Sequence, residues 1–224
     1  MMLPLFIILS VLTLLILVFI AAFLIKTSGT SKKSKTHMPA NEIAGLIGEI
    51  EVISHLESLL SEDEHLLPHL LLPLKNGYKT EIDCVLISHK GIFCIEIKNW
   101  SGAITGGDED DSWIQKNGEL DGRDRSHRNP VKQNKAHSEI LEKKLDKKYS
   151  VNNCVIFSNL SSGSVIYSDH TFSLRQFVNH YKPLSNDKLN AHQIASVFQK
   201  LLPYVASKEE LANHAKEIKQ KHSL

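Results

Sequence analysis

The fold is decided by residues 80–99, which read TEIDCVLISHKGIFCIEIKN. Two runs rich in β-branched and apolar residues, 80–88 and 91–99, are separated only by His89 and Lys90. Such runs on either side of a two-residue break are typical of a β-hairpin. We therefore predict two antiparallel strands at the centre of the fold.

Helical and extended patterns surround this hairpin on both sides. Apolar residues at helical spacing predict a helix over 41–60, and Asn129-Pro130 supplies an N-cap and a first-turn proline for a helix that runs to about Lys148. Further strands are expected over 66–74 and 151–158, and further helices over 173–181, 188–202 and from Ser207 onward. This order predicts an α/β domain with a mixed sheet flanked by helices.

The expected register of the hairpin brings charged side chains together. A turn at residues 89–90 places Val85 opposite Cys94 and Asp83 opposite Glu96. Lys98 shares a face with Glu96 because residues two apart on a strand point the same way. The other face is apolar and suits a core; it carries Cys84, Leu86, Phe93, Ile95 and Ile97. Asp83, Glu96 and Lys98 are thus expected to form one patch.

Two opposed carboxylates repel each other, so this patch requires a compensating charge. A divalent cation that prefers oxygen ligands, Mg²⁺ or Mn²⁺, would supply it, with the backbone carbonyl of Ile97 as a third ligand. Lys98 would then orient or deprotonate a water, or stabilise a phosphoryl oxygen. An ordinary Glu96–Lys98 surface pair, with Asp83 solvated at a strand end, is equally consistent with these residues alone.

Several segments, in this order, resemble a known family. They are 45–49 (GLIGE), 81–87 (EIDCVLI), 91–102 (GIFCIEIKNWSG), Trp113 and 129–134 (NPVKQN). Over about residues 41–145 the chain resembles the NERD (nuclease-related domain) family, a branch of the PD-(D/E)XK nuclease superfamily. The resemblance implies a restriction-endonuclease-like mixed central sheet between helices and divalent-metal-dependent cleavage of phosphodiesters. Ile82 stands where the superfamily's name motif has proline.

The resemblance also implies which residues act. Carried over position by position, the active-site set is Glu49, Asp83, Glu96, Lys98 and Gln133, and the metal ligands are Asp83, Glu96, Glu49 and the Ile97 carbonyl. Gly45 and Gly48 each cost a helix about 1 kcal/mol relative to alanine, which predicts close packing of that helix on the sheet beside Glu49. Gln133 lies near a helix N-terminus, which favours a phosphate. A solvent-facing role is the alternative for Glu49 and for Gln133.

A local basic patch offers a surface for nucleic acid. It consists of Arg123, Arg125, Arg128, Lys132 and Lys135, and Asp121 and Asp124 interrupt it. Because 26 Lys and Arg face 25 Asp and Glu, the chain has no global basic charge, and a nucleic-acid site must be local. Three cysteines are too few and too scattered for a disulfide scaffold or a closed zinc site.

Residues 3–25 contain no charged side chain and predict a membrane anchor. At 1.5 Å per residue such a helix is about 34 Å long, enough to cross a hydrocarbon core of about 30 Å. A cleaved signal peptide is the alternative, but it requires a basic start and a shorter apolar run. Lys26, Lys32, Lys33 and Lys35 follow the span and no basic residue precedes it, so the remainder is expected in the cytoplasm. We expect an anchor over 1–26, a linker over 27–39 and a NERD-like nuclease domain with C-terminal helices over 40–224.

The function expected from these observations is a single-pass, membrane-anchored nuclease that uses Mg²⁺ or Mn²⁺ and hydrolyses DNA or, as the less favoured substrate, RNA. Its partners would be the nucleic acid and, through residues 3–25, the lipid bilayer. The rival hypothesis is a non-catalytic module of the same fold that binds nucleic acid or a protein at the membrane.

Overall fold

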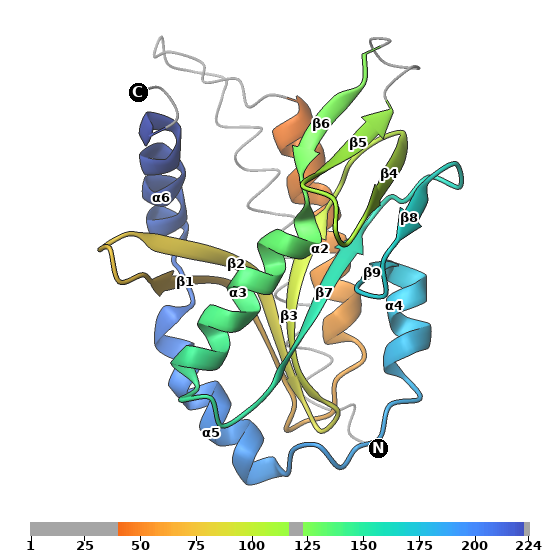
Figure 1. Ribbon diagram of the computed structural model, residues 1–224. Coiled ribbons are helices and arrows are strands. Elements are labelled where there is room, and N and C mark those ends of the chain that lie inside the picture. The colour runs from red at the N-terminus through yellow and green to blue at the C-terminus, as the bar shows by residue number, and fades with distance from the viewer. Residues whose placement is uncertain (1–39, 117–122, 222–224) are drawn as a thin grey trace, which may run out of the picture. The chain divides into compact units, whose positions relative to one another are not determined.

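The computed structural model describes residues 40–116 and 123–221, which form helices and strands in an α/β arrangement (Figure 1). The elements before the middle of the chain are α2 (Ala40–Glu57), β1 (His65–Pro73), β2 (Lys79–Ser88), β3 (Gly91–Lys98), β4 (Ala103–Gly107), β5 (Ser112–Lys116) and β6 (Arg125–Arg128). Those that follow are α3 (Pro130–Lys144), β7 (Val151–Phe157), β8 (Val165–Tyr167), β9 (Thr171–Ser173), α4 (Leu174–Tyr181), α5 (Ala191–Leu201), a short 3₁₀ turn η2 (Leu202–Tyr204) and α6 (Lys208–Lys221).

The strands form two sheets. The larger has the order β1-β2-β3-β7-β9; its first three strands are antiparallel, whereas β7 runs parallel to β3 and to β9. This is the mixed sheet expected from the sequence. The second sheet, β6-β5-β4-β8, was not expected as a separate layer.

Helices cover both faces of the mixed sheet, which confirms the α/β class. On one face, Leu141 of α3 and Val197 of α5 pack against Val85 and Ile92 of the hairpin. On the other face, side chains of α2 and α4 pack against the predicted apolar set, Cys84, Leu86, Phe93, Ile95 and Ile97. The alternation of side chains along β2 and β3 therefore determines which helices each face meets.

The hairpin has the predicted register from its turn up to Cys84. Ser88 pairs with Gly91 across the His89-Lys90 turn, and Val85 pairs with Cys94. The β2–β3 ladder ends at the pair Cys84↔Ile95, one pair before the expected Asp83–Glu96 pair. Beyond that point β2 pairs only with β1, and the two hairpin strands open.

The helix ends differ from the sequence expectations by a few residues. α3 stops at Lys144, four residues earlier than expected, because Asp146 and Lys147 take left-handed backbone conformations with φ of 58° and 55°. α5 starts at Ala191, where Asn190 and Gln193 form a capping box, rather than at Lys188. Such boundaries depend on single capping residues that periodicity does not locate.

Within residues 40–116 and 123–221, no helix is both long and apolar enough to cross a bilayer. The expected anchor over 1–26 and the expected linker over 27–39 lie outside the residues that the structure describes.

Candidate active site

Asp83 lies where the hairpin strands open. Its Oδ2 accepts a hydrogen bond of 2.8 Å from the backbone N–H of Ile97, so the carboxylate occupies the gap that follows the last ladder pair. Burial raises the pKa of Asp83 well above its ordinary value, and the neighbouring Glu96 raises it further, against the opposing charge of Lys98. Burial, more than its charged neighbours, therefore makes Asp83 harder to ionise than a solvated aspartate.

Glu96 is the most buried carboxylate of the cluster, with 2% of its surface exposed. Its Oε1 accepts hydrogen bonds from Lys98 Nζ at 2.5 Å and from Gln133 Nε2 at 2.7 Å. Its Oε2 has no hydrogen-bond partner among the described residues and lies 3.5 Å from Nδ1 of His137. Burial acts to raise the pKa of Glu96, but His137 and Lys98 outweigh it and lower that pKa. Glu96 is thus a buried carboxylate whose Oε1 accepts two hydrogen bonds, whereas its Oε2 accepts none and lies near His137.

Lys98 keeps its proton in this site. Burial acts to lower its pKa, but the carboxylates of Glu96 and Asp83 together raise it. An ammonium with a raised pKa is a poor base at neutral pH. In this structure the Lys98 ammonium forms an ion pair with Glu96 Oε1.

Glu49 approaches the cluster from α2. It is partly buried, and its Oε1 lies 3.6 Å from Nδ1 of His69. Burial raises its pKa, and Glu81 and Glu96 add to that effect while His69 opposes it. Glu49 therefore shares the electrostatic environment of the hairpin carboxylates, although it comes from a helix on the other side of the sheet.

The missing side chain of Gly48 explains how α2 comes so close to the ends of β3 and β7. A Cβ at this position would lie 2.4 Å from Ser158 Oγ and 2.9 Å from Asn99 Cβ, at the ends of β7 and β3. Close packing at Gly48 is as predicted. The same prediction for Gly45 is wrong, since among the described residues nothing lies within 4 Å of a Cβ there.

α3 presents Gln133 and His137 to Glu96 from one side of the helix, as their four-residue spacing requires. The helix is fixed at its start by Asn129, whose side-chain oxygen accepts from the N–H groups of Val131 and Lys132. The amide of Asn129 donates to three carbonyl oxygens of the loop after β4, those of residues 107, 108 and 110. The N-cap predicted from the sequence thus also joins the second sheet to the site.

Sequence reasoning missed three neighbours of the cluster. His69 contacts Glu49 and, at 3.3 Å, Glu81, and Thr80 Oγ1 lies 3.2 Å from Nε2 of His137. His69 stands opposite Asp83 in the β1–β2 register, which the sequence alone does not give. Trp100, which follows β3, stacks on His127 with ring centroids 4.2 Å apart.

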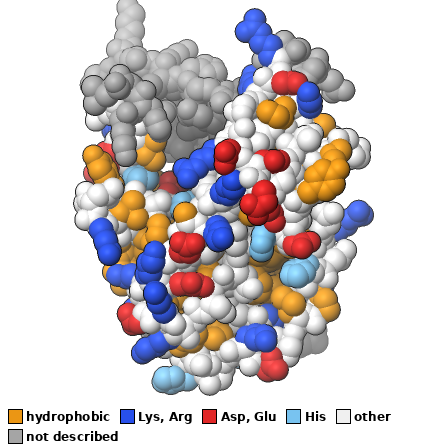
Figure 2. All heavy atoms as spheres, in the orientation of Figure 1, with side chains coloured by type: hydrophobic (Ala, Val, Ile, Leu, Met, Phe, Trp, Pro, Cys, Tyr) orange, Lys and Arg blue, Asp and Glu red, His pale blue; other side chains and the backbone are white. Residues whose placement is uncertain are grey.

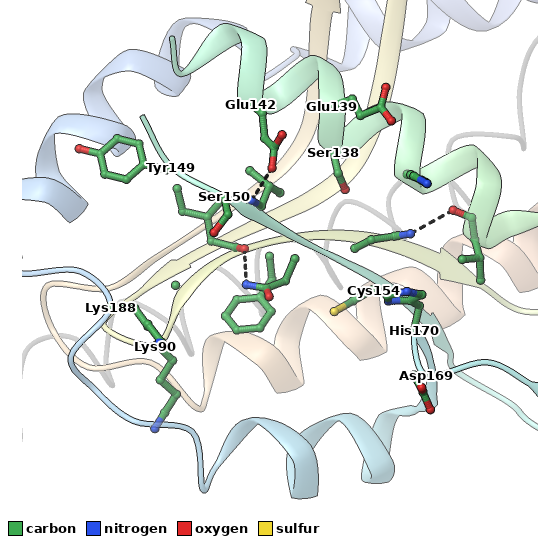
Figure 3. A pocket seen from close by; sticks show the side chains of 18 of the residues that line it. Lys90, Ser138, Glu139, Glu142, Tyr149, Ser150, Cys154, Asp169, His170 and Lys188 are labelled. Carbon is green, nitrogen blue, oxygen red and sulfur yellow. Dashed lines mark hydrogen bonds between the residues drawn. The ribbon is translucent and has the colours of Figure 1, made fainter. Parts of the chain in front are cut away.

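The residues of the predicted basic patch lie on β6, on α3 and just before them. Arg125 and Arg128 are exposed on β6. Lys132 Nζ contacts the carboxylate of Asp111 at 2.9 Å, which offsets part of its charge. Lys132 and Lys135 line a groove of about 1200 Å³ that runs along β7 between α3 and α4 (Figure 3). Acidic and basic side chains alternate over the face seen in Figure 2, so it has no uniform positive field.

The acidic cluster contains the oxygen donors that a divalent cation prefers, but these donors are not arranged in a complete coordination geometry. Within the described ranges, no three His, Cys, Asp or Glu side chains are arranged to hold a metal ion. The bare, buried Oε2 of Glu96 and the poorly compensated carboxylate of Asp83 are nevertheless the hard oxygen donors that such an ion prefers.

The larger sheet carries Asp83, Glu96 and Lys98 at the open end of its hairpin. Residues 44–158 match the family model described as nuclease-related domain, and the chain therefore belongs to the NERD family. The placement of this family in the PD-(D/E)XK superfamily is consistent with that match.

One relative and the solved structures complete the comparison. An uncharacterised protein of Bacillus anthracis is 30% identical to the chain over 108 residues, which are 48% of this chain. The chain spans about half the length of that relative, 49%. No solved structure matches the chain.

Proposed function

We propose that this chain is a divalent-metal-dependent nuclease that hydrolyses phosphodiester bonds of DNA or, as the less favoured substrate, RNA. The observation that carries the proposal is the buried Glu96 carboxylate: its Oε1 accepts from Lys98 and Gln133, and its Oε2 has no hydrogen-bond partner among the described residues and lies 3.5 Å from His137 Nδ1. This arrangement lies inside a domain of the NERD family.

The residues that would hold the ion are Asp83, Glu96, Glu49 and the Ile97 carbonyl. A bound Mg²⁺ or Mn²⁺ supplies a water of lowered pKa and offsets the surplus negative charge. Lys98, as an ammonium, stabilises the charge that develops on the phosphoryl oxygens. Gln133 fixes Glu96 through Oε1, so that Oε2 keeps its direction. The Ile97 N–H does the same for Asp83.

We further propose that residues 3–25 anchor the enzyme in a bilayer as a single span, with the domain over 40–224 on the cytoplasmic side. The support is the sequence: an uncharged apolar run followed by lysines. The basic residues Arg123, Arg125, Arg128, Lys132 and Lys135 are proposed to bind the nucleic-acid backbone.

The test is cleavage of duplex DNA, single-stranded DNA and RNA by the full chain with Mg²⁺ or Mn²⁺. Lys98→Ala should reduce the rate about 10²- to 10³-fold with the fold retained, because the ammonium acts on transition-state charge. Glu139→Gln, an exposed acid on α3, is the matched control and should cleave like the wild type. Full activity in both Asp83→Ala and Glu96→Ala would refute the proposal.

The second candidate is a non-catalytic module that binds nucleic acid. It is favoured by the direct Glu96–Lys98 ion pair and by the absence, within the described residues, of a ready three-ligand cluster. A gel shift with DNA in the presence of Mg²⁺, without cleavage and unchanged in Glu96→Gln, would support this candidate.

A further inference from the structure

His69 interrupts strand β1. Its φ is 49°, in the left-handed region, whereas the strand continues on both sides of it from His65 to Pro73. In the β1–β2 ladder the pairs Pro68↔Cys84 and Leu70↔Ile82 flank it, so His69 stands opposite Asp83 without pairing. A left-handed residue other than glycine is strained, and such strain concentrates at functional sites.

The interruption leaves the apolar core intact. Leu67 and Leu70 both pack in the cluster with α3 and α5, although residues three apart on a regular strand face opposite sides. On β2, Ile82 and Val85 show the same departure. The alternation of side chains between the two faces therefore shifts by one residue in both strands at the His69–Asp83 position. Apolar side chains remain buried before and after this position. His69 and Asp83 themselves belong to neither apolar cluster of this sheet.

The kink directs the imidazole of His69 at two carboxylates. Its Nδ1 lies 3.3 Å from Glu81 Oε1 and 3.6 Å from Glu49 Oε1. In the 3.3 Å contact Glu81 Oε1 is the acceptor, which requires a form of the imidazole with a hydrogen on Nδ1. The carbonyl of His69 accepts a 2.9 Å hydrogen bond from the N–H of Ala206, which fixes the backbone on the other side.

We propose that His69 is a positioning residue of the acidic site: its Nδ1 donates to Glu81, and its imidazole, 3.6 Å from Glu49 Oε1, attracts Glu49 and thereby holds it toward Asp83 and Glu96. The proposal rests on the proposed nuclease function and adds a residue to it. It gives the strained backbone of β1 a role: without the kink, the histidine would not bridge strand β2 and helix α2 at the point where Asp83 lies.

Glycine substitution separates strain from positioning. His69→Gly relieves the left-handed strain and removes the imidazole, whereas Lys147→Gly, at an exposed position with a φ of 55°, relieves similar strain away from the cluster. Both variants of the full chain should melt at or above the wild-type temperature. Mn²⁺-dependent DNA cleavage should fall about 10- to 100-fold in His69→Gly, as for other supports of metal ligands, and stay unchanged in Lys147→Gly. His69→Asn, which tolerates a positive φ and offers an amide N–H, should recover part of the rate.

Two results would overturn the inference in an active enzyme: undiminished cleavage by His69→Gly, or parallel loss of melting temperature and cleavage. A second readout needs no turnover. The carboxyl carbon-13 resonance of Glu49 in metal-free protein at one fixed alkaline pH should move in His69→Gly and not in Lys147→Gly. If the wild type does not cleave, the nuclease proposal fails, and this resonance still decides the role of His69: an unmoved signal refutes it.

Discussion

Replacement of Gly48 by alanine tests how α2 delivers Glu49. The added Cβ would lie 2.4 Å from Ser158 Oγ and 2.9 Å from Asn99 Cβ, both closer than real Cβ contacts come. Overpacking of this kind costs about 1–3 kcal/mol, and alanine regains about 1 kcal/mol of helix propensity. Because two neighbours must move, we take the upper end of the cost and expect net destabilisation of about 2 kcal/mol.

Gly45 provides the matched control on the same helix. Among the described residues nothing lies within 4 Å of a Cβ at that position, so Gly45→Ala should stabilise by about 1 kcal/mol. Urea denaturation of the full chain, followed by tryptophan fluorescence, measures both through the midpoint at constant slope. Ser158→Ala added to Gly48→Ala should recover only part of the loss, since Asn99 still clashes. Equal stability of the two single variants would refute the packing argument.

Three further predictions concern the site and its supports. Because the folded pKa of Asp83 is raised, its contribution to stability is fully present below the unfolded pKa of about 3.9 and is lost as the pH rises through the folded pKa. Asp83→Asn should therefore raise the melting temperature at pH 8, and this gain should be absent near pH 4. Equal gains at the two pH values would contradict the raised pKa of Asp83. Asn129→Ala removes the N-cap and leaves loop carbonyls unpaired, which should cost about 2–4 kcal/mol in urea denaturation. Gly106→Ala would put a Cβ 2.3 Å from the rigid indole of Trp113 and should lower the midpoint by at least as much as Gly48→Ala, with a shifted emission maximum.

The hairpin could be predicted because two independent signals agree. The period of two along 80–88 and 91–99 gives the strands, and the two-residue break gives the register, which holds from Ser88 to Cys84. Gln133 donates to Glu96, so α3 faces this patch.

The rest of the site depends on strand pairing and local packing, which the periodicity of the sequence does not predict. The ladder stops at Cys84, and the phase change at His69 is visible only once β1 and β2 are paired. Gly45 and Gly48 look alike in the sequence, yet only Gly48 meets another segment. Strand β6 consists of polar and basic residues, and β9 has three residues, so neither gives an apolar signal.

The energetically unfavourable features of this fold lie where β2 separates from β3. His69 has a strained backbone, Asp83 has a raised pKa, and Glu96 keeps a bare buried oxygen, all within one end of the mixed sheet. A structural role for these groups predicts that neutral replacements such as Glu96→Gln weaken the fold, because buried ion pairs are broken. A functional role predicts the reverse for Asp83→Asn and His69→Gly, which remove a cost that the fold itself does not require. These variants therefore distinguish a catalytic site from a stabilising one. The two roles predict opposite signs for the change in melting temperature, and this change is compared with the change in cleavage rate.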